Sequence, residues 1–593
     1  MPHFKRNYSV GMNIAYMFVV RCLSCNKIKG DMTMTKKTKW LVVLLGVVLV
    51  VLVGCYGKED NSSASPTGGN STDKESTTDG DKAVGQELHL VAGGDLATMS
   101  SLGSVDALAV TAMNSVFEGL YRIGPENTPV PGMAESYETS EDGTVYTFKL
   151  RQDAVWSNGT PVTAHDFEYA WKRAINPETQ AIYSYLMLDI KNAASVQKEG
   201  DPLYGKVDEI GVKALNDYTL EVQLNAPLPY FLSLTTYAPF FPLNKEFTEA
   251  QGDQYALEAA NMIYNGPFVM ESWQHGQGWT FVKNENYWDK DSVKLTKITQ
   301  KIVKDTATAV NLYEAGEIDT AELSSEYVAQ YKDSPEFSTF LKPNTYFIRM
   351  NHENKFLSNK NIRKAIDMAW DKQGFADVIL QDGSIPAYFL VPLGLSTDEK
   401  GVDFREGNGD MNKTNVELAK EAWATGLKEL GVDQIKLEFL TYDRAESKKA
   451  AEFIKNQLET NLKGLELTIN MQPNKQKLAL EGAVDYDLDY GGWGPDYQDP
   501  MTYIELFEST AYYNQSHYKN EEVDALIKKA KTTSDVSERW KLMQQAEKIM
   551  LDDVAFAPTF QKGISRLKKP YVKNLYEHPF SADISYKWVE IVK

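Results

Sequence analysis

The chain has 593 residues, and its 62 Lys or Arg against 82 Asp or Glu give a formal net charge of −20. This length is sufficient for two or three domains with sizeable hydrophobic cores. An acidic chain is a poor match for DNA or RNA, because binding to nucleic acid requires a basic surface. We therefore expect no nucleic-acid partner.

A secretory signal is predicted near the N-terminus. Lysines at positions 36, 37 and 39 precede a wholly apolar run over 40–53, which ends in Leu52-Val53-Gly54-Cys55. A basic segment, an apolar core of about 14 residues and small residues before the cleavage site are typical of a signal peptide. The cysteine at the cut resembles the lipobox of bacterial lipoproteins, which implies that Cys55 is lipidated. The alternative is an ordinary transmembrane anchor, but the run is shorter than the roughly 20 residues that span a bilayer.

The segments on either side of Cys55 have different expected roles. We expect residues 1–54 to be a leader and signal peptide, with Met1, Met32 or Met34 as the translation start. The first 54 residues carry eight Lys or Arg and one Asp, so the remaining chain has a formal charge of −27. Electrostatic docking on anionic lipid is therefore excluded, and acyl chains at Cys55 would hold the protein at the membrane. Residues 55–85 are rich in Ser, Thr, Gly and Asp and predict a disordered tether.

Cysteine chemistry is not expected in the exported body. The other two cysteines, Cys22 and Cys25, lie within the leader, so disulfides cannot stabilise the mature chain. Their C-x-x-C spacing has no second pair to complete a zinc site. We expect no cofactor and no metal.

The predicted elements of the body begin with a strand over 86–92, a helix over 107–121 and a proline-rich loop over 125–131. Residues 145–150 alternate with the period of a half-buried strand, between turn-forming Asp-Gly and Asn-Gly pairs. Thr163 is the predicted N-cap of an amphipathic helix that ends near residue 174. Further helices are predicted over 361–371, 414–430, 445–461, 521–531 and 536–551, and further strands over 218–224, 436–440 and 465–471. Interleaved strands and helices favour an α/β fold.

Several motifs resemble those of one known family. The segments Gly132–Tyr137, Asp142–Arg151 and Val155–Phe167 resemble the signature of the oligopeptide-binding proteins of ABC importers, in family 5 of the bacterial extracellular solute-binding proteins. Further landmarks are Asn265–Phe268, Asn284–Trp288, Gly316–Asp319 and Gly492–Tyr497. The similarity extends from about residue 86 to the C-terminus.

The resemblance implies a periplasmic-binding-protein type II clamp with two lobes and an extra domain inserted in the first. Carried over to this chain, lobe I comprises 86–117, 243–346 and 560–593, the extra domain 118–242, and lobe II 347–559. The chain would pass between the lobes near residues 346–347 and 559–560. The ligand would lie enclosed in the cleft between them.

The resemblance also implies which residues meet the ligand. Asp496 would bind the α-ammonium group of a peptide, since an enclosed ammonium requires a charged partner. Trp493 would line a side-chain pocket, and Gly491, Gly492 and Gly494 would let the backbone approach the ligand. Asp499 precedes Pro500 and is interpreted as a helix N-cap.

The remaining candidates are weaker. An extended peptide could pair its backbone with residues 491–494 and with the stretch near 104–107, which includes Val105, Asp106 and Ala107. Tyr183 is either a pocket residue or part of the core. Tyr490 stands where some relatives have an arginine for the peptide carboxylate, so the preferred peptide length stays open. Asp485, Asp487 and Asp489 would share one strand face, interpreted as solvated and not as a cation site.

The sequence therefore predicts a monomeric binding protein that delivers oligopeptides to the permease subunits of an ABC transporter. A receptor for a peptide pheromone is an alternative on the same fold. A third hypothesis changes the ligand, since clamps of this kind also take dipeptides, nickel complexes or sugars, but Asp496 in the Trp-x-x-Asp-Tyr motif favours a peptide amine. A cell-surface hydrolase is a further alternative, but no nucleophile motif accompanies the seven histidines, and the Walker A sequence is absent. Turnover of a substrate by the purified body would separate the hydrolase from the binding proteins.

Overall fold

The computed structural model describes residues 85–103, 106–398, 400–511, 513–533 and 535–592. All of them belong to one unit of contacting residues, Lys82–Lys593. The predicted signal peptide, the lipidation site at Cys55, the tether up to residue 84 and Val105 lie outside the described residues. None of the helices in the described ranges is long and apolar enough to cross a membrane.

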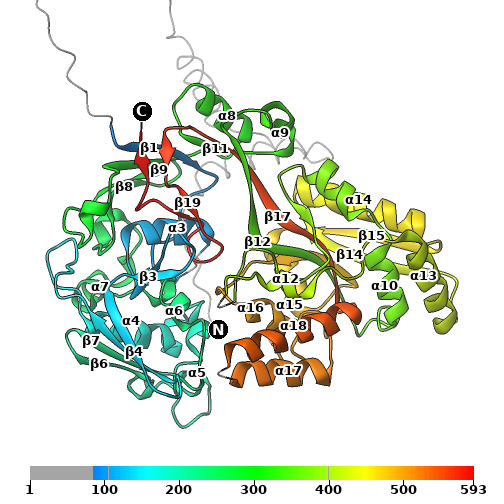
Figure 1. The fold of residues 1–593 in the computed structure, drawn as a ribbon, viewed down its shortest axis with the longest axis horizontal. Coiled ribbons are helices and arrows are strands. Elements are labelled where there is room, and N and C mark those ends of the chain that lie inside the picture. The colour runs from blue at the N-terminus through cyan, green and yellow to red at the C-terminus, as the bar shows by residue number, and fades with distance from the viewer. Residues whose placement is uncertain (1–84, 104–105, 399, 512, 534, 593) are drawn as a thin grey trace, which may run out of the picture. The chain divides into compact units, whose positions relative to one another are not determined.

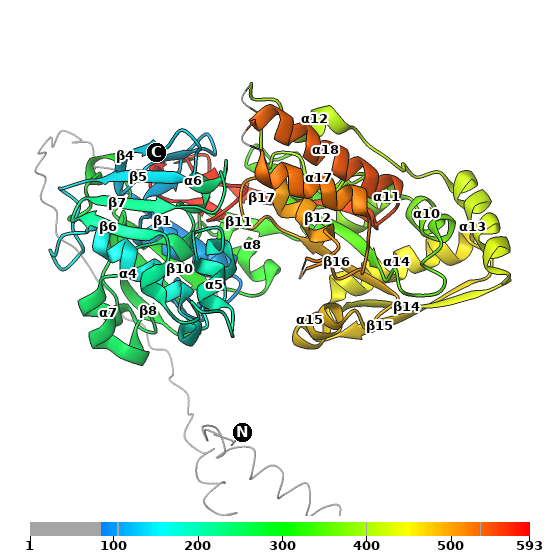
Figure 2. The ribbon, with the colours of Figure 1, turned by 90° about the horizontal axis from the view of Figure 1, so that it is seen from below.

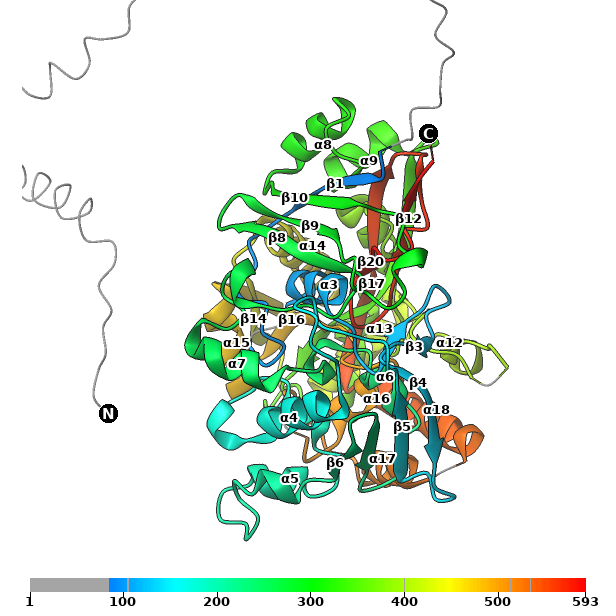
Figure 3. The ribbon, with the colours of Figure 1, turned by 90° about the vertical axis from the view of Figure 1, so that its left-hand side faces the viewer.

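A four-stranded sheet contains the first predicted strand. Its order is β1-β10-β9-β8, with β1 parallel to β10 and the other pairs antiparallel. Figure 3 shows these strands side by side. Leu88 and Leu90 of β1 are buried on one face, as the alternation in the sequence predicts. The strands are β1 (Glu87–Ala92), β8 (Phe268–Gln274), β9 (Gly278–Lys283) and β10 (Lys297–Ile302).

Helix α3 (Ala107–Val116) is shorter than predicted. Asp106 caps it by accepting a hydrogen bond from the backbone N–H of Ala109 at 2.8 Å. The helix ends at Val116 because the backbone N–H of Glu118 donates to Asn265 Oδ1 instead of continuing the helix. The chain then forms β2 (Tyr121–Ile123), which pairs with β3 (Pro129–Pro131) in the region predicted as a loop.

A second four-stranded sheet has the order β4-β5-β7-β6 and is antiparallel throughout. Helix α4 (Ala164–Ile175) packs on it and begins with the predicted capping box of Thr163 and Asp166. Burial raises the pKa of Asp166 to about 6, against hydrogen bonds from Thr163 and Trp156 that lower it. The strands are β4 (Ala134–Thr139), β5 (Val145–Leu150), β6 (Val212–Asn216) and β7 (Thr219–Gln223).

The third large sheet contains two long antiparallel strands, β12 (Phe337–Met350) and β17 (Phe556–Lys568), which lie side by side in Figure 1. Their pairing shifts register between Leu341 and Thr345, and again between Tyr346 and Phe347. The sheet order is β11-β17-β12-β16-β14-β15, and a short strand, β13, also pairs with β17. The other strands are β11 (Thr320–Leu323), β13 (Ile385–Pro386), β14 (Ile435–Tyr442), β15 (Leu465–Gln472) and β16 (Leu488–Trp493).

Helices cover this third sheet and begin close to the predicted residues. Asn415, Asn520 and Asp535 cap three of them with side-chain hydrogen bonds to backbone N–H groups. Helices α17 and α18 lie side by side (Figure 2). A buried cluster around Ile348, Phe439 and Ile454 is separate from the cluster that contains the first sheet. The helices are α10 (Lys360–Met368), α13 (Val416–Leu430), α14 (Ala445–Asn461), α15 (Asn474–Ala483), α16 (Met501–Ile504), α17 (Glu521–Thr532) and α18 (Val536–Asp552).

Two of the family landmarks, Asn265–Phe268 and Asn284–Trp288, converge on one buried carboxylate, Glu118, which is 1% exposed. Its oxygens accept hydrogen bonds from Arg122 at 2.7 Å, Tyr287 at 2.7 Å and Trp288 at 2.6 Å. Asn265 bonds to both backbone groups of Glu118. These landmark residues therefore hold separate segments of the chain together and do not form the cavity described next.

Candidate ligand-binding cavity

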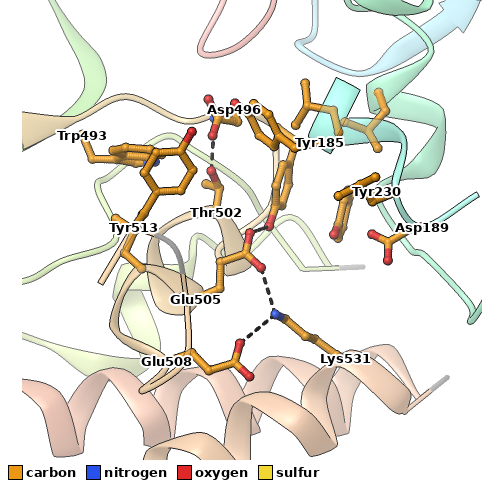
Figure 4. A pocket seen from close by; sticks show the side chains of 16 residues that line it. Tyr185, Asp189, Tyr230, Trp493, Asp496, Thr502, Glu505, Glu508, Tyr513 and Lys531 are labelled. Atoms are coloured by element: carbon orange, nitrogen blue, oxygen red, sulfur yellow. Dashed lines mark hydrogen bonds and ion pairs between the residues drawn. The ribbon is translucent and has the colours of Figure 1, made fainter. Parts of the chain in front are cut away.

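A cavity of about 450 Å³ lies between residues that are some 300 positions apart in sequence. One wall comes from the segment after α4, and the other from the end of β16, α16, the segment that follows it and the end of α17 (Figure 4). The lining residues are Tyr185, Leu186, Leu188, Asp189, Tyr230, Leu234, Trp493, Asp496, Tyr497, Thr502, Glu505, Leu506, Glu508, Ala511, Tyr513 and Lys531.

Asp496 is held in the loop that follows β16. Its backbone N–H donates to Thr502 Oγ1 at 3.1 Å, and the Tyr185 hydroxyl from the opposite wall is hydrogen-bonded to its carboxylate. Tyr503 fixes the start of the same loop by donating to the carbonyl of Trp493 at 2.9 Å. The carboxylate therefore keeps a defined position inside the cavity.

The electrostatics of Asp496 are unusual for a carboxylate. Burial raises its pKa to about 7, assisted by the nearby charge of Glu505, and only the hydrogen bond with Tyr185 lowers it. Within the described ranges, no Lys, Arg or His side chain forms an ion pair with it. An enclosed carboxylate without a cation is costly to ionise, so the site favours a ligand that brings its own positive charge.

Aromatic rings form much of the wall. Tyr230 and Tyr497 stack with ring centroids 4.2 Å apart and planes within 8°. Trp493 packs against Tyr513 at 5.2 Å, and Tyr513 lies 6.2 Å from Tyr185 on the opposite wall. Gln498 donates to the carbonyl of Asn127 at 2.9 Å and adds another contact between the two sides.

The structure brings together two of the predicted site residues, Trp493 and Asp496, as lining residues of one cavity. Tyr183 does not line the cavity but packs behind it, with its ring 5.8 Å from Tyr185 and 5.7 Å from Tyr237. Burial raises the pKa of Tyr183, and the charges of Asp496 and Asp106 raise it further. The start of α3, with Asp106 and Ala107, is therefore close to the cavity wall.

Tyr490 is placed away from the cavity. It is 5% exposed and packs in the core between Phe439 and Tyr346, each with ring centroids 6.3 Å away. At this position the side chain fills the interior beside β12 and β14, so the structure gives it a packing role.

The three glycines are explained by packing against the protein itself. A Cβ atom at Gly491 would lie 2.6 Å from Arg349, one at Gly492 would lie 3.0 Å from the carbonyl of Thr345, and one at Gly494 would lie 2.4 Å from Asn344. A side chain at Gly492 would press on the backbone of β12, and one at Gly491 or Gly494 would displace the ends of Arg349 or Asn344. Close approach to a ligand is not needed to account for them.

The predicted solvated face of 485–489 is wrong for Asp489, whereas Asp485 is exposed. Asp489 is fully buried and pairs with Lys477 at 3.0 Å and Arg349 at 3.0 Å. Asp487 is also bonded within the protein, accepting from the backbone N–H of Glu438 and the amide of Asn354. The strand begins only at Leu488, and β14 and β12 cover both of its edges.

Asp499 has the structural role that its position before Pro500 predicts. It accepts from the backbone N–H of Met501 at 2.9 Å and binds Arg539 through two hydrogen bonds of 2.7 Å and 2.8 Å. Helix α16 begins at Met501, one residue later than expected.

Sequence reasoning missed most of the cavity. Its undetected members include Tyr185, Asp189, Tyr230, Glu505, Glu508, Tyr513 and Lys531. The only local signal is the clustering of tyrosines at 183–185 and 512–513. In the part of the chain that the structure describes, no three His, Cys, Asp or Glu side chains are grouped to hold a metal ion.

Fold and cavity together define a two-lobed α/β binding protein of the periplasmic type. The profile described as bacterial extracellular solute-binding proteins, family 5, matches residues 128–515, and the chain belongs to this family.

Named relatives cover nearly the whole described chain. It is 35% identical to the dipeptide-binding protein DppE of Bacillus subtilis over 81% of this chain and 87% of that protein. The crystal structure of the substrate-binding domain of an oligopeptide ABC transporter from Bacillus anthracis is 44% identical, with a TM-score of 0.74, and covers 86% of this chain and 99% of its own. Listeria monocytogenes OppA bound to peptide is 40% identical, with a TM-score of 0.73 and coverages of 86% and 99%.

Proposed function

We propose that this protein captures oligopeptides with a free amino terminus and delivers them to the permease subunits of an ABC importer. The observation that carries the proposal is the enclosed carboxylate of Asp496, which has no cationic partner among the described residues. A peptide ammonium supplies the missing charge and a charge-assisted hydrogen bond. The names of the relatives, a dipeptide-binding protein and peptide-binding transport proteins, agree with this ligand class.

The remaining parts of the proposal concern how the protein is organised. The lobes follow the predicted boundaries, with β12 and β17 carrying the chain between them. The protein is a monomer without catalytic activity, tethered on the outer side of the cell membrane by lipid at Cys55. Closure around a peptide distinguishes loaded from empty protein, because the peptide binds the closed form more tightly.

The decisive test compares one peptide with a free amino terminus and the same peptide N-acetylated. Isothermal titration calorimetry on the purified protein should show binding of the free peptide and strongly weakened binding of the acetylated one. Recovery of intact peptide after long incubation, measured by mass spectrometry, should exclude turnover. Equal affinity for the two peptides would refute the amine anchor, and cleavage products would refute the binding-only role.

The affinity for peptide should pass through a maximum as the pH is raised. Below about pH 7 the Asp496 carboxyl is protonated in the free protein, so affinity should rise with pH by up to about tenfold per unit. It should fall again when the peptide α-amine loses its proton, at a pKa of about 7.7–8.0. Calorimetry in buffers of different ionisation enthalpy should detect proton release near neutral pH. A flat profile between about pH 5.5 and 7.5 would contradict the assignment of Asp496.

A further inference from the structure

The charge of the cavity exceeds what a single ammonium group requires. Four carboxylates line it, from Asp189, Asp496, Glu505 and Glu508, against one ammonium, that of Lys531. The formal balance is therefore −3. An enclosed site with this balance favours a ligand that carries more than one positive charge.

Two of these carboxylates already share one cation within the protein. Lys531 forms ion pairs of 3.0 Å with Glu505 and 3.0 Å with Glu508. Glu505 also accepts a hydrogen bond from Tyr497, whose ring stacks on Tyr230. Lys531, Glu505 and Glu508 therefore pair with one another within the cavity wall. They are weak partners for a ligand.

Asp189 differs from these two residues. It lines the cavity, keeps an exposed side chain, and has neither a hydrogen bond nor an ion pair to its carboxylate among the described residues. Its backbone is fixed, because its carbonyl accepts from the backbone N–H of Asn225 at 2.8 Å. Although solvent reaches Asp189, the surrounding protein partly desolvates its carboxylate and raises its pKa, and the more distant charge of Lys531 lowers it. The Asp189 carboxylate therefore lines the cavity with its oxygens available to accept hydrogen bonds from a ligand.

Asp189 and Asp496 occupy different places in the cavity. In Figure 4, Asp189 lies beside Tyr230 at one end of the lining set, Trp493 lies at the other end, and Asp496 lies between them. The rings of Tyr230 and Tyr185 belong to the same wall as Asp189. Aromatic faces beside a carboxylate suit a long side chain that ends in a cation.

We propose that the cavity selects peptides with a lysine or arginine side chain within their first three residues, and that Asp189 pairs with that side-chain cation. This inference rests on the proposed function, with Asp496 holding the amino terminus of the same peptide. Asp189 would then set side-chain preference, whereas Asp496 would serve every peptide with a free amine.

The test uses pentapeptides that are identical except at one of the first three positions, where each carries lysine, norleucine or glutamate. Norleucine keeps the aliphatic chain of lysine and removes its charge. Calorimetry on the wild-type protein should show tighter binding of the lysine peptide, by about tenfold over norleucine at the best position. The glutamate peptide should bind most weakly. The preference should decrease with added salt, because part of the interaction is exposed to solvent.

Variants locate the source of the preference. Asp189→Asn should bring the lysine-to-norleucine ratio close to one, because it should weaken binding of the lysine peptide far more than binding of the norleucine peptide. Glu271→Gln, the same acid-to-amide change at an exposed residue of β8 outside the cavity, should preserve the ratio. Equal binding of all three peptides by wild type, or an unchanged ratio in Asp189→Asn, would overturn this inference alone. Absence of binding for every free-amine peptide would overturn the proposed function as well.

Discussion

Replacing Asp496 by asparagine should weaken the binding of free-amine peptides by about 2–5 kcal/mol, roughly thirtyfold to several thousandfold. Asparagine has the same shape and keeps an acceptor for the Tyr185 hydroxyl. The loss would therefore come from the missing negative charge opposite an enclosed ammonium. Calorimetric titration of variant and wild type with one free-amine peptide measures the difference.

N-acetylated peptide provides the matched ligand for this comparison. It has no ammonium group, so Asp496→Asn should change its affinity little. The exposed variant Glu271→Gln should bind both peptides as the wild type does. A variant that lost the same affinity for both peptides would indicate a collapsed cavity, and a variant with unchanged affinity for the free peptide would remove Asp496 from the site.

The same substitution should change how stability depends on pH. The pKa of Asp496 is higher in the folded chain than in the unfolded one, so the folded state binds more protons between about pH 4 and pH 7. The free energy of unfolding should therefore fall as pH rises through this window in the wild type. In Asp496→Asn this contribution should vanish, and denaturant unfolding of the free protein at several pH values would reveal it.

Local sequence patterns predicted the elements that depend on neighbouring residues. The helix predicted over 445–461 is α14, and the capping box at Thr163 is present. Periodicity and capping act within a few residues, so the sequence contains these signals. The predicted C-terminal end of α3 was wrong. The backbone N–H of Glu118 donates to Asn265, which lies 147 positions further along the chain, so the helix stops before it.

The sequence could predict only those site residues that lie together in one motif. Trp493 and Asp496 lie three residues apart and both line the cavity. Asp189, Tyr230 and Lys531 come from distant segments, and only the fold brings them to the same wall. For Asp489 the local sequence predicted the wrong environment. Its alternating acidic context favours a solvated face, yet Lys477 on α15 and Arg349 on β12 bury it as an ion-paired group.

The buried carboxylate of Glu118 should be among the most important single groups for stability. Burial disfavours its charge, but Arg122 and Lys587 more than compensate, so its pKa lies below the usual value. Glu118→Gln should lower the free energy of unfolding by about 3–5 kcal/mol, because Arg122, 3% exposed, would keep a buried charge without its partner. One of the oxygens that accept from Tyr287 and Trp288 would also become a donor.

Chemical denaturation at pH 7 measures this loss, with Glu271→Gln as the exposed control that should stay within about 0.5 kcal/mol of wild type. The lowered pKa also fixes the sign of the pH dependence. The stability that Glu118 contributes is present above the unfolded pKa of about 4.3 and is lost as pH falls further. The difference between wild type and Glu118→Gln should therefore shrink on acidification. A difference that is small at pH 7, or that grows at acid pH, would show that the Glu118–Arg122 pair does not stabilise the fold.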